Sequence, residues 1–145
     1  MFLANRTFCR KCTVGFYTFV QIFQGMNKKT LVIGASTKPD RYSNMAIRRL
    51  IQHQIPVLAV GLREGEVEGV KIVKEHVQIP GIHTVTVYVG PSNQPACYDY
   101  ILSLNPLRVI FNPGTENPAF ETILSERGIE VVRGCTLVML SSDQY

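Results

Sequence analysis

The residues best suited to chemistry in this 145-residue chain lie in one short stretch, residues 30–43. An apolar run ends at Gly34 and Ala35, whose small side chains would let main-chain N–H groups come close to a ligand. The following turn supplies hydroxyl groups and a cation just before a helical pattern begins, at Ser36, Ser43 and Arg41. Together these features favour an anion, most naturally a phosphate, at a helix N-terminus. The alternative is an ordinary strand–turn–helix with a serine N-cap.

A second basic residue, Arg63, follows the next buried run, residues 57–60. In a dinucleotide-binding fold that uses NAD, an acidic residue at this place accepts hydrogen bonds from the ribose hydroxyls. An arginine suits a ribose phosphate instead, as in NADP or the 3′-phosphate of coenzyme A, and it disfavours unmodified NAD. A solvated surface arginine is the other interpretation of Arg63.

These residues need a scaffold, and the apolar runs predict one. From Lys28 onward, helical patterns alternate with five runs typical of strands, at residues 31–33, 57–60, 84–89, 108–111 and 129–132. Such an alternation predicts an α/β fold, a doubly wound (Rossmann-like) five-stranded parallel sheet with helices on both faces. Residues 67–73 are expected to form a small strand or hairpin arm, and residues 74–78 a short helical turn.

Capping signals delimit the expected helices. Ser43 is the expected N-cap of a helix that finishes near Gln54, because the residue before Pro56 is pushed out of helical geometry. Pro95 stands in the first turn of a second helix, and Asn117 caps a third.

The loops at the carboxyl ends of the five expected strands are where ligands bind in such folds. They comprise residues 34–43, 61–65, 90–93, 112–117 and 133–135. Nearly all the clusters of glycine with polar residues fall in these loops. This agreement between topology and composition is the main argument for a binding site from the residues alone.

Charge and composition exclude some classes of partner. The net charge is +4, but residues 26–145 carry 12 basic and 11 acidic side chains, since three basic residues and no acid precede them. A body near neutrality without a basic run is not typical of a nucleic-acid-binding protein. The uncharged run at residues 13–23 is too short to span a bilayer. We expect a cytoplasmic protein with a small-molecule nucleotide ligand, no nucleic acid and no membrane; a protein partner is not predicted.

Residues 1–25 differ from the rest and hold five of the seven phenylalanines. We expect this leader to lie outside the fold, as a mis-assigned start, a tag or a targeting segment, and residues 26–145 to form one domain. Cys9 and Cys12 form a Cys-x-x-Cys pair, but no second pair accompanies them and the context is not that of a redox helix. The three histidines lack partners at ligand spacing, so no metal site is expected.

Four motifs together resemble those of the small stand-alone coenzyme-A-binding proteins. They are Gly34-Ala-Ser-x-x-Pro-x-Arg-x-Ser43, a Val-Glu-Gly-Val-Lys run ending in Ile79-Pro80, Gly-x-x-Asn117-Pro-Ala-Phe, and Val-Val-x-x-Cys135. The resemblance covers about residues 28–140. It implies the fold of the N-terminal CoA-binding domain of the succinyl-CoA synthetase α subunit.

The resemblance also implies the ligand, coenzyme A or an acyl-CoA, and a role for each matching residue. The pyrophosphate would be cradled by small residues of the first loop with a cation nearby, namely Gly34, Ala35, Ser36, Ser43 and Arg41. The other parts of the ligand would meet Arg63 (adenosine phosphate), Gly90 and Pro91 (adenine side), and Asn112, Gly114 and Asn117 (pantetheine side).

The chain departs from the family at three places. It has Val60-Gly-Leu for Val-Asn-Pro, Asn112-Pro-Gly for Gln-x-Gly, and Arg133-Gly-Cys for Asp-Arg-Cys. The synthetase's phosphorylated histidine lies in a further domain that has no match in this chain. We therefore expect binding without catalysis.

Two other functions stay open. One is an NADP-linked oxidoreductase, for which Arg63 would meet the ribose phosphate. The other is a redox or acyl-carrier protein acting through Cys135, whose thiol beside Arg133 could exchange with CoA disulfide. An inert cysteine packed near the sheet edge is the simpler interpretation of Cys135.

Overall fold

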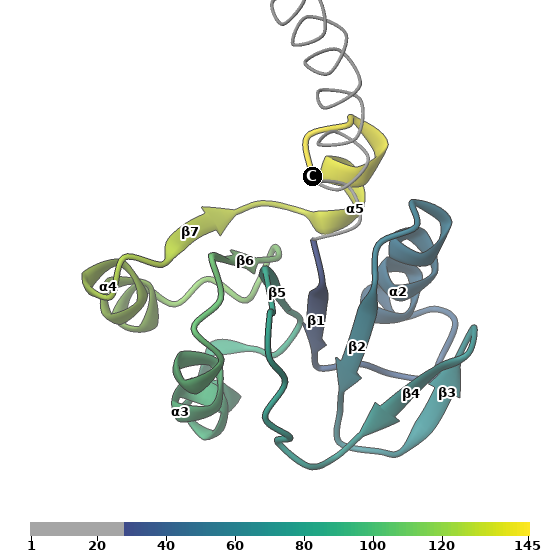
Figure 1. The fold of residues 1–145 in the computed structure, drawn as a ribbon, viewed down its shortest axis with the longest axis horizontal. Helices are drawn as coiled ribbons and strands as arrows, with labels where there is room; N and C mark the ends of the chain where they lie inside the picture. The colour runs from purple at the N-terminus through teal and green to yellow at the C-terminus, as the bar shows by residue number, and fades with distance from the viewer. Residues whose placement is uncertain (1–27) are drawn as a thin grey trace, which may run out of the picture.

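The computed structural model describes residues 28–145, and a seven-stranded sheet runs through their centre (Figure 1). The strands are β1 (Thr30–Ile33), β2 (Val57–Val60), β3 (Gly65–Val67), β4 (Val70–Val73), β5 (Thr84–Val87), β6 (Arg108–Phe111) and β7 (Glu130–Arg133). The helices are α2 (Tyr42–Gln52), α3 (Pro95–Leu104), α4 (Pro118–Glu126) and α5 (Thr136–Ser141), with a 3₁₀ turn, η1 (Pro91–Asn93). The leader and its Cys-x-x-Cys pair lie outside the described residues.

The prediction of five parallel strands was correct for their positions but wrong for the size and character of the sheet. The order is β3-β4-β2-β1-β5-β6-β7, and β3 pairs antiparallel with β4 while the other pairs are parallel. The two extra strands form a hairpin around Glu68 and Gly69, whose φ angles are both positive at 48° and 84°. This hairpin confirms the expectation of a small strand or hairpin arm at residues 67–73, but arms of three and four residues are too short for a strand period to place them in the main sheet.

Two local predictions were also wrong. Ser43 is the second residue of α2, not its N-cap; Arg41 holds that position, and no side chain caps the helix. Residues 74–78 form no helix. This segment crosses from β4 to β5 with two anchors from α3, because Tyr100 donates its hydroxyl to the Val77 carbonyl (2.8 Å) and stacks on His76.

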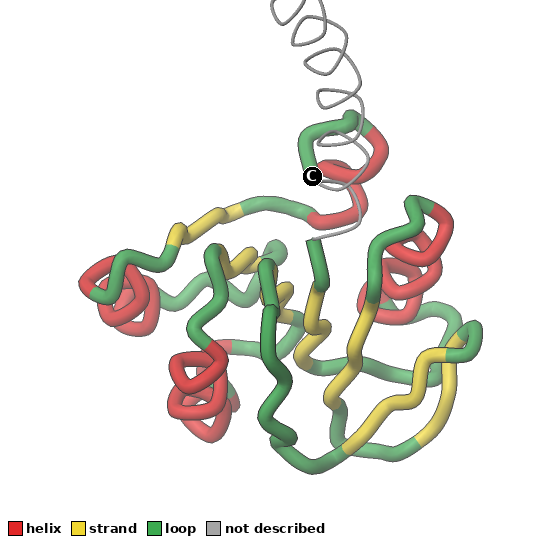
Figure 2. The backbone as a smooth tube through the Cα atoms, in the orientation of Figure 1, coloured by secondary structure: helices red, strands yellow, loops and turns green. Residues whose placement is uncertain are grey.

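Helices cover both faces of the sheet, as expected (Figure 2). Successive residues of β1 point to opposite faces, so Leu31 and Ile33 join one buried cluster and Val32 joins the other. The first cluster is completed by α3 and α4, and the second by α2 and α5. No helix in residues 28–145 is long and apolar enough to cross a membrane.

The order of the strands creates a switch point beside β1. Its two neighbours are β2 on one side and β5 on the other, both parallel and in register along all four residues. The chain therefore leaves β1 in one direction and returns on the other side through β5. Loops that follow the carboxyl ends of β1 and β5 diverge at such a point and leave a crevice between them, where α/β folds bind ligands.

Candidate functional site

The loop after β1 begins with a glycine that no other residue could replace without strain. Gly34 has a φ of +89°, and a Cβ there would lie 2.9 Å from a Val89 methyl group and 3.1 Å from the Tyr88 carbonyl carbon. The N–H groups of Gly34 and Ala35 both donate to the Val60 carbonyl, at 2.9 and 3.0 Å. Contrary to the expectation from the sequence, these two donors are used within the protein, so donors for a ligand must come from later in the loop.

Such donors follow directly, in the loop and at the start of α2. Within residues 36–44, the main-chain N–H groups of six residues have no acceptor in the described chain: Ser36, Thr37, Asp40, Tyr42, Ser43 and Asn44. The first turn of α2 carries neither a side-chain cap nor an acidic residue. Unpaired N–H groups at the start of an eleven-residue helix place a partial positive charge there. The start of α2 is therefore suited to bind an anion.

Asn44 fixes the shape of this loop and was not anticipated from the sequence. Its side chain, 1% exposed, donates to the Ser36 carbonyl at 3.0 Å and accepts from the Arg48 Nε at 2.9 Å. The Ser36 hydroxyl in turn accepts from the Lys38 N–H at 3.2 Å. An amide side chain in the first turn of a helix that follows a hydroxyl-rich loop was the signal that could have identified Asn44.

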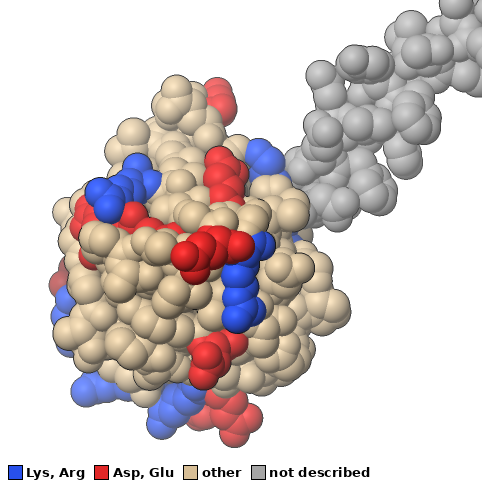
Figure 3. Space-filling model, turned by 90° about the vertical axis from the view of Figure 1, so that its left-hand side faces the viewer, with Lys and Arg blue, Asp and Glu red and all other residues tan. Residues whose placement is uncertain are grey.

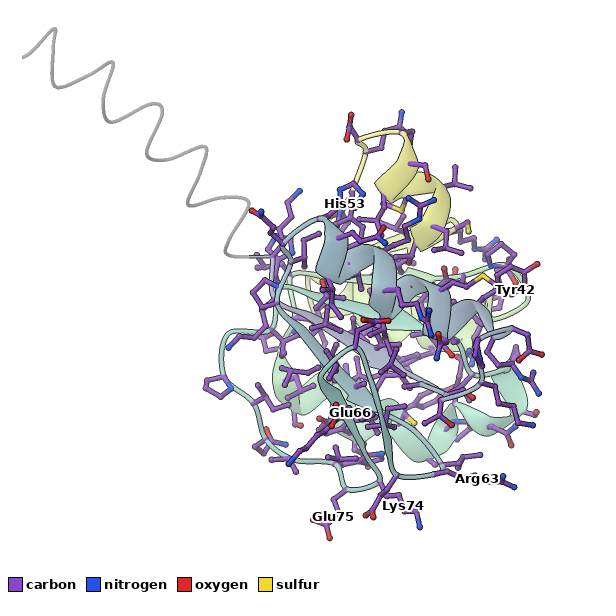
Figure 4. All side chains as sticks on the ribbon, turned by 90° about the vertical axis from the view of Figure 1, so that its right-hand side faces the viewer. Tyr42, His53, Arg63, Glu66, Lys74 and Glu75 are labelled. Atoms are coloured by element: carbon purple, nitrogen blue, oxygen red, sulfur yellow. The ribbon has the colours of Figure 1, made fainter. Side chains whose placement is uncertain are left out.

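Arg63 is carried on a loop that packs directly against the loop after β1. A Cβ on Gly61 would lie only 2.3 Å from the Ala35 carbonyl oxygen, and one on Gly65 2.3 Å from the Thr37 methyl group. Both ends of loop 61–65 therefore lie against residues 35–37. Figure 4 shows Arg63 projecting into solvent at the same end of the molecule as Tyr42, the first residue of α2. Arg63 forms no ion pair among residues 28–145.

The loops after β5 and β6 are tied together by Gln94, which is 2% exposed. Its Nε2 donates to the carbonyls of Val89 (2.9 Å) and Thr115 (2.6 Å), and its Oε1 accepts from the Asn117 amide at 2.9 Å. Asn117 caps α4 as predicted, because its Oδ1 accepts from the Phe120 N–H at 3.3 Å. Gln94 thus sets the spacing between the segment with Gly90 and Pro91 and the segment with Gly114.

Asn112 is a buried anchor rather than an exposed polar group. Its Nδ2 donates to the Thr86 hydroxyl (2.7 Å) and the Val87 carbonyl (2.9 Å), and its Oδ1 accepts from the Thr136 N–H (2.9 Å). These bonds occupy its amide, and those of Asn117 occupy the other predicted asparagine. Both can therefore position the loop, while direct contact with a ligand would fall to their main chain and neighbours.

Cys135 lies between β7 and α5 as a partly exposed free thiol. The neighbouring Arg133 does not remain free to assist it: its guanidinium pairs with Glu121 of α4, at 2.8 Å between Nη2 and Oε2. This hydrogen-bonded pair raises the pKa of Arg133 and directs its charge toward α4. The cation expected to activate the thiol is thus occupied elsewhere.

Tyr88, the first residue after β5, carries a partly buried phenol ring that packs against the core cluster of α2 and α5. Its hydroxyl lies toward Thr86 and Thr136 but makes no hydrogen bond of good geometry with them or with any other described residue. Burial raises the pKa of Tyr88 to about 12, so the phenol stays protonated at neutral pH.

The histidines are placed elsewhere or used in packing. His53 follows the end of α2, His76 stacks on Tyr100, and His83 bonds to the Thr84 hydroxyl before β5 begins. Residues 28–145 contain no group of three histidine, cysteine or carboxylate side chains that could hold a metal ion. Acidic and basic side chains are mixed on the face that Figure 3 shows.

Three comparisons relate the chain to known proteins. A family model described as "CoA binding domain" matches residues 28–141. Among proteins with curated descriptions, none matches significantly.

Solved structures include the crystal structure of an uncharacterized protein with 53% identity and a TM-score of 0.80, covering 81% of this chain and 98% of that one. A protein from Thermus thermophilus matches with 27% identity and a TM-score of 0.71, covering 81% and 90%. A hypothetical protein from Pyrococcus horikoshii OT3 matches with 26% identity and a TM-score of 0.72, covering 87% and 89%.

Proposed function

The chain belongs to the CoA-binding domain family, and from this premise we propose that it binds coenzyme A or an acyl-CoA through the loop after β1 and the start of α2. The observation that carries the proposal is the set of unpaired N–H groups in residues 36–44, which ends in a helix without a cap. A pyrophosphate supplies the charge and the acceptor oxygens that such a helix end lacks. We propose that this module binds its ligand without catalysing a reaction.

Arg63 is proposed to pair with the 3′-phosphate of the adenosine. The close packing of Gly61 and Gly65 on residues 35–37 supports this assignment, because it holds the arginine beside the loop that would bind the pyrophosphate. An exposed guanidinium without an acidic partner in the described chain can turn toward a phosphate without breaking an ion pair. Gly90 and Pro91 would then line the adenine side, and residues 112–117 the pantetheine side.

Isothermal titration of the protein with CoA, acetyl-CoA, dephospho-CoA and NADPH tests the proposal. We expect CoA to bind most tightly and dephospho-CoA, which lacks the 3′-phosphate, to bind more weakly. Absence of binding by CoA and acetyl-CoA at millimolar concentration would contradict the proposal. Tighter binding of NADPH than of CoA would favour an NADP-linked oxidoreductase, because Arg63 suits a 2′-phosphate equally well.

Two variants separate the two phosphate contacts. Arg63→Ala should weaken CoA binding by about 1.5–3 kcal/mol, the range for a hydrogen bond to a charged group, and leave dephospho-CoA binding nearly unchanged. Ser36→Tyr should weaken both ligands, because its ring would fill the space beside the unpaired N–H groups. Arg127→Ala, at the exposed end of α4, is the matched control for loss of one positive charge. Equal losses for CoA and dephospho-CoA in Arg63→Ala would remove Arg63 from the 3′-phosphate.

A further inference from the structure

The helix α5 is too short to be stable by itself, and it is fastened at both of its ends. It has six residues, whereas isolated helices need about twelve or more to form in water. At its start, the Thr136 N–H donates to Asn112 (2.9 Å), and the Thr136 hydroxyl bonds to the Thr86 hydroxyl (2.7 Å). This first attachment is buried, and its partner Asn112 lies in the loop after β6, which is part of the candidate site.

At its end, α5 closes in a Schellman-type turn that reverses the chain. The Gln144 N–H bonds back to the Met139 carbonyl at 2.8 Å, and Asp143 between them has a φ of 55° in the left-handed region. Residues 142–144 are exposed. The chain after Leu140 therefore regains the protein interior only at Tyr145.

Tyr145 is held at the amino ends of the strands, the opposite end of the sheet from the candidate site. Its hydroxyl bonds to Thr30, the first residue of β1, and its main-chain oxygen accepts from the Lys28 ammonium. The guanidinium of Arg108, the first residue of β6, lies 4.6 Å from the ring centroid, and the Lys28 ammonium lies 5.9 Å from it. We call the group Lys28, Thr30, Thr84 and Arg108 the tyrosine socket.

The socket is specific for a phenol rather than a generic apolar gap. Thr30 and Thr84 are completely buried, and the Arg108 Nε donates to Thr84 at 2.8 Å. Arg108 Nη2 is buried without a hydrogen-bond partner in the described chain. The guanidinium instead makes a cation–π contact with the face of the Tyr145 ring. Hydroxyl-bearing threonines on one side and cations over the face match the polar tip and the π-face of tyrosine.

We propose that Tyr145 and the tyrosine socket form a latch that keeps α5 on the sheet and thereby regulates the candidate site. Release of Tyr145 leaves α5 attached through Thr136 and through Leu140, which is 2% exposed in the cluster that it shares with α2, and removes the anchor of the chain that follows the helix. The bond from Thr136 to Asn112 then loses part of its support. Asn112 also holds Thr86 and the Val87 carbonyl, so the loosening reaches the carboxyl ends of β5 and β6. The effect on ligand affinity rests on the proposed function, whereas the latch itself does not.

Amide hydrogen exchange of the full chain tests the latch. In Tyr145→Ala, exchange in residues 136–141 should rise by about tenfold or more while exchange in β1 and β5 rises much less, because the latch opens α5 locally. p-Cresol, which has the shape of the lost side chain, should restore protection, and toluene should restore less because it lacks the hydroxyl. Val138→Ala is the matched control, since Val138 is 62% exposed on the same helix.

Tyr145→Phe keeps the ring and loses the bond to Thr30, so it should give a smaller rise confined to α5 and should leave the rest of the protein folded. Unchanged exchange of α5 in both variants, or an equal rise in all strands, would overturn the latch. CoA affinity should fall several-fold in Tyr145→Ala and recover with p-cresol. Loosened α5 with unchanged CoA affinity would refute regulation of the site, and failure of the wild-type protein to bind CoA would refute only the proposed function.

Discussion

A single methyl group added at Gly61 should separate the two loops of the candidate site. The new Cβ would lie 2.3 Å from the Ala35 carbonyl oxygen, where ordinary contact begins at 3.4 Å, so the main chain would have to move by about 1 Å. The same Cβ would lie 3.0 Å from an Ile72 methyl group, which would also have to shift. Overpacking of this kind costs about 1–3 kcal/mol of folding free energy. We therefore expect Gly61→Ala to lower the free energy of unfolding by about that amount.

Urea unfolding measures this loss, and titration with CoA measures its effect on the site. The affinity of Gly61→Ala for CoA should also fall, because the displaced loop carries Arg63 away from residues 35–37. Gly134→Ala is the control: its Cβ would meet nothing closer than 3.7 Å, so its stability should stay within about 0.5 kcal/mol of the wild type. Wild-type stability in Gly61→Ala would show that the loops are not in close contact, and the assignment of Arg63 would lose its support.

Three further predictions concern the frame around the site. Asp143→Gly should raise the free energy of unfolding by up to about 1 kcal/mol in urea titrations, because glycine adopts the left-handed φ of 55° without strain; a loss of stability would contradict this turn. Burial, with the nearby charges of Arg108 and Lys28, lowers the pKa of His83, so the folded protein favours the neutral imidazole. The stabilisation that depends on neutral His83 is fully present above pH 6.5, the ordinary pKa of histidine, and is lost as the pH falls below that value. His83→Gln should therefore flatten the pH dependence of the unfolding free energy below pH 6.5. An unchanged slope of that dependence would contradict the role of His83. Asn117→Ala should cost about 1–2 kcal/mol in thermal or urea unfolding, since the cap of α4 and the bond to Gln94 are lost together; a neutral result would contradict the cap.

Most of the fold could be predicted from the sequence because its main strands are short, mostly apolar runs separated by clear turn residues. All residues of β1 and β5 and the last three of β6 are buried, and such strands leave a clear pattern. The hairpin of β3 and β4 was anticipated only as a small strand or hairpin arm at residues 67–73, because Glu68 stands in a left-handed conformation that glycine or asparagine usually marks. Chain topology then followed from the crossover rule, and the switch point beside β1 agrees with it.

The sequence located the turn after β1, but the main-chain donors expected at Gly34 and Ala35 are used within the protein, and the side-chain bonds across the fold were not foreseen. Gly34 could be recognised from its place between a strand and a helix. Gln94 and Thr136 could not, because their partners lie 21 to 24 residues away in sequence. Asn112 was identified as a polar loop residue, yet its role as a buried anchor depends on contacts that only the folded chain creates.

The most direct test of the central claim is an amide NMR titration of isotopically labelled protein with CoA. We predict that the largest chemical-shift changes fall on the unpaired N–H groups of residues 36–44, with smaller changes in loop 61–65. Dephospho-CoA should reproduce the first set and lose most of the second. Largest changes in residues 128–133 or at the amino ends of the strands, with residues 36–44 unaffected, would contradict the proposed site.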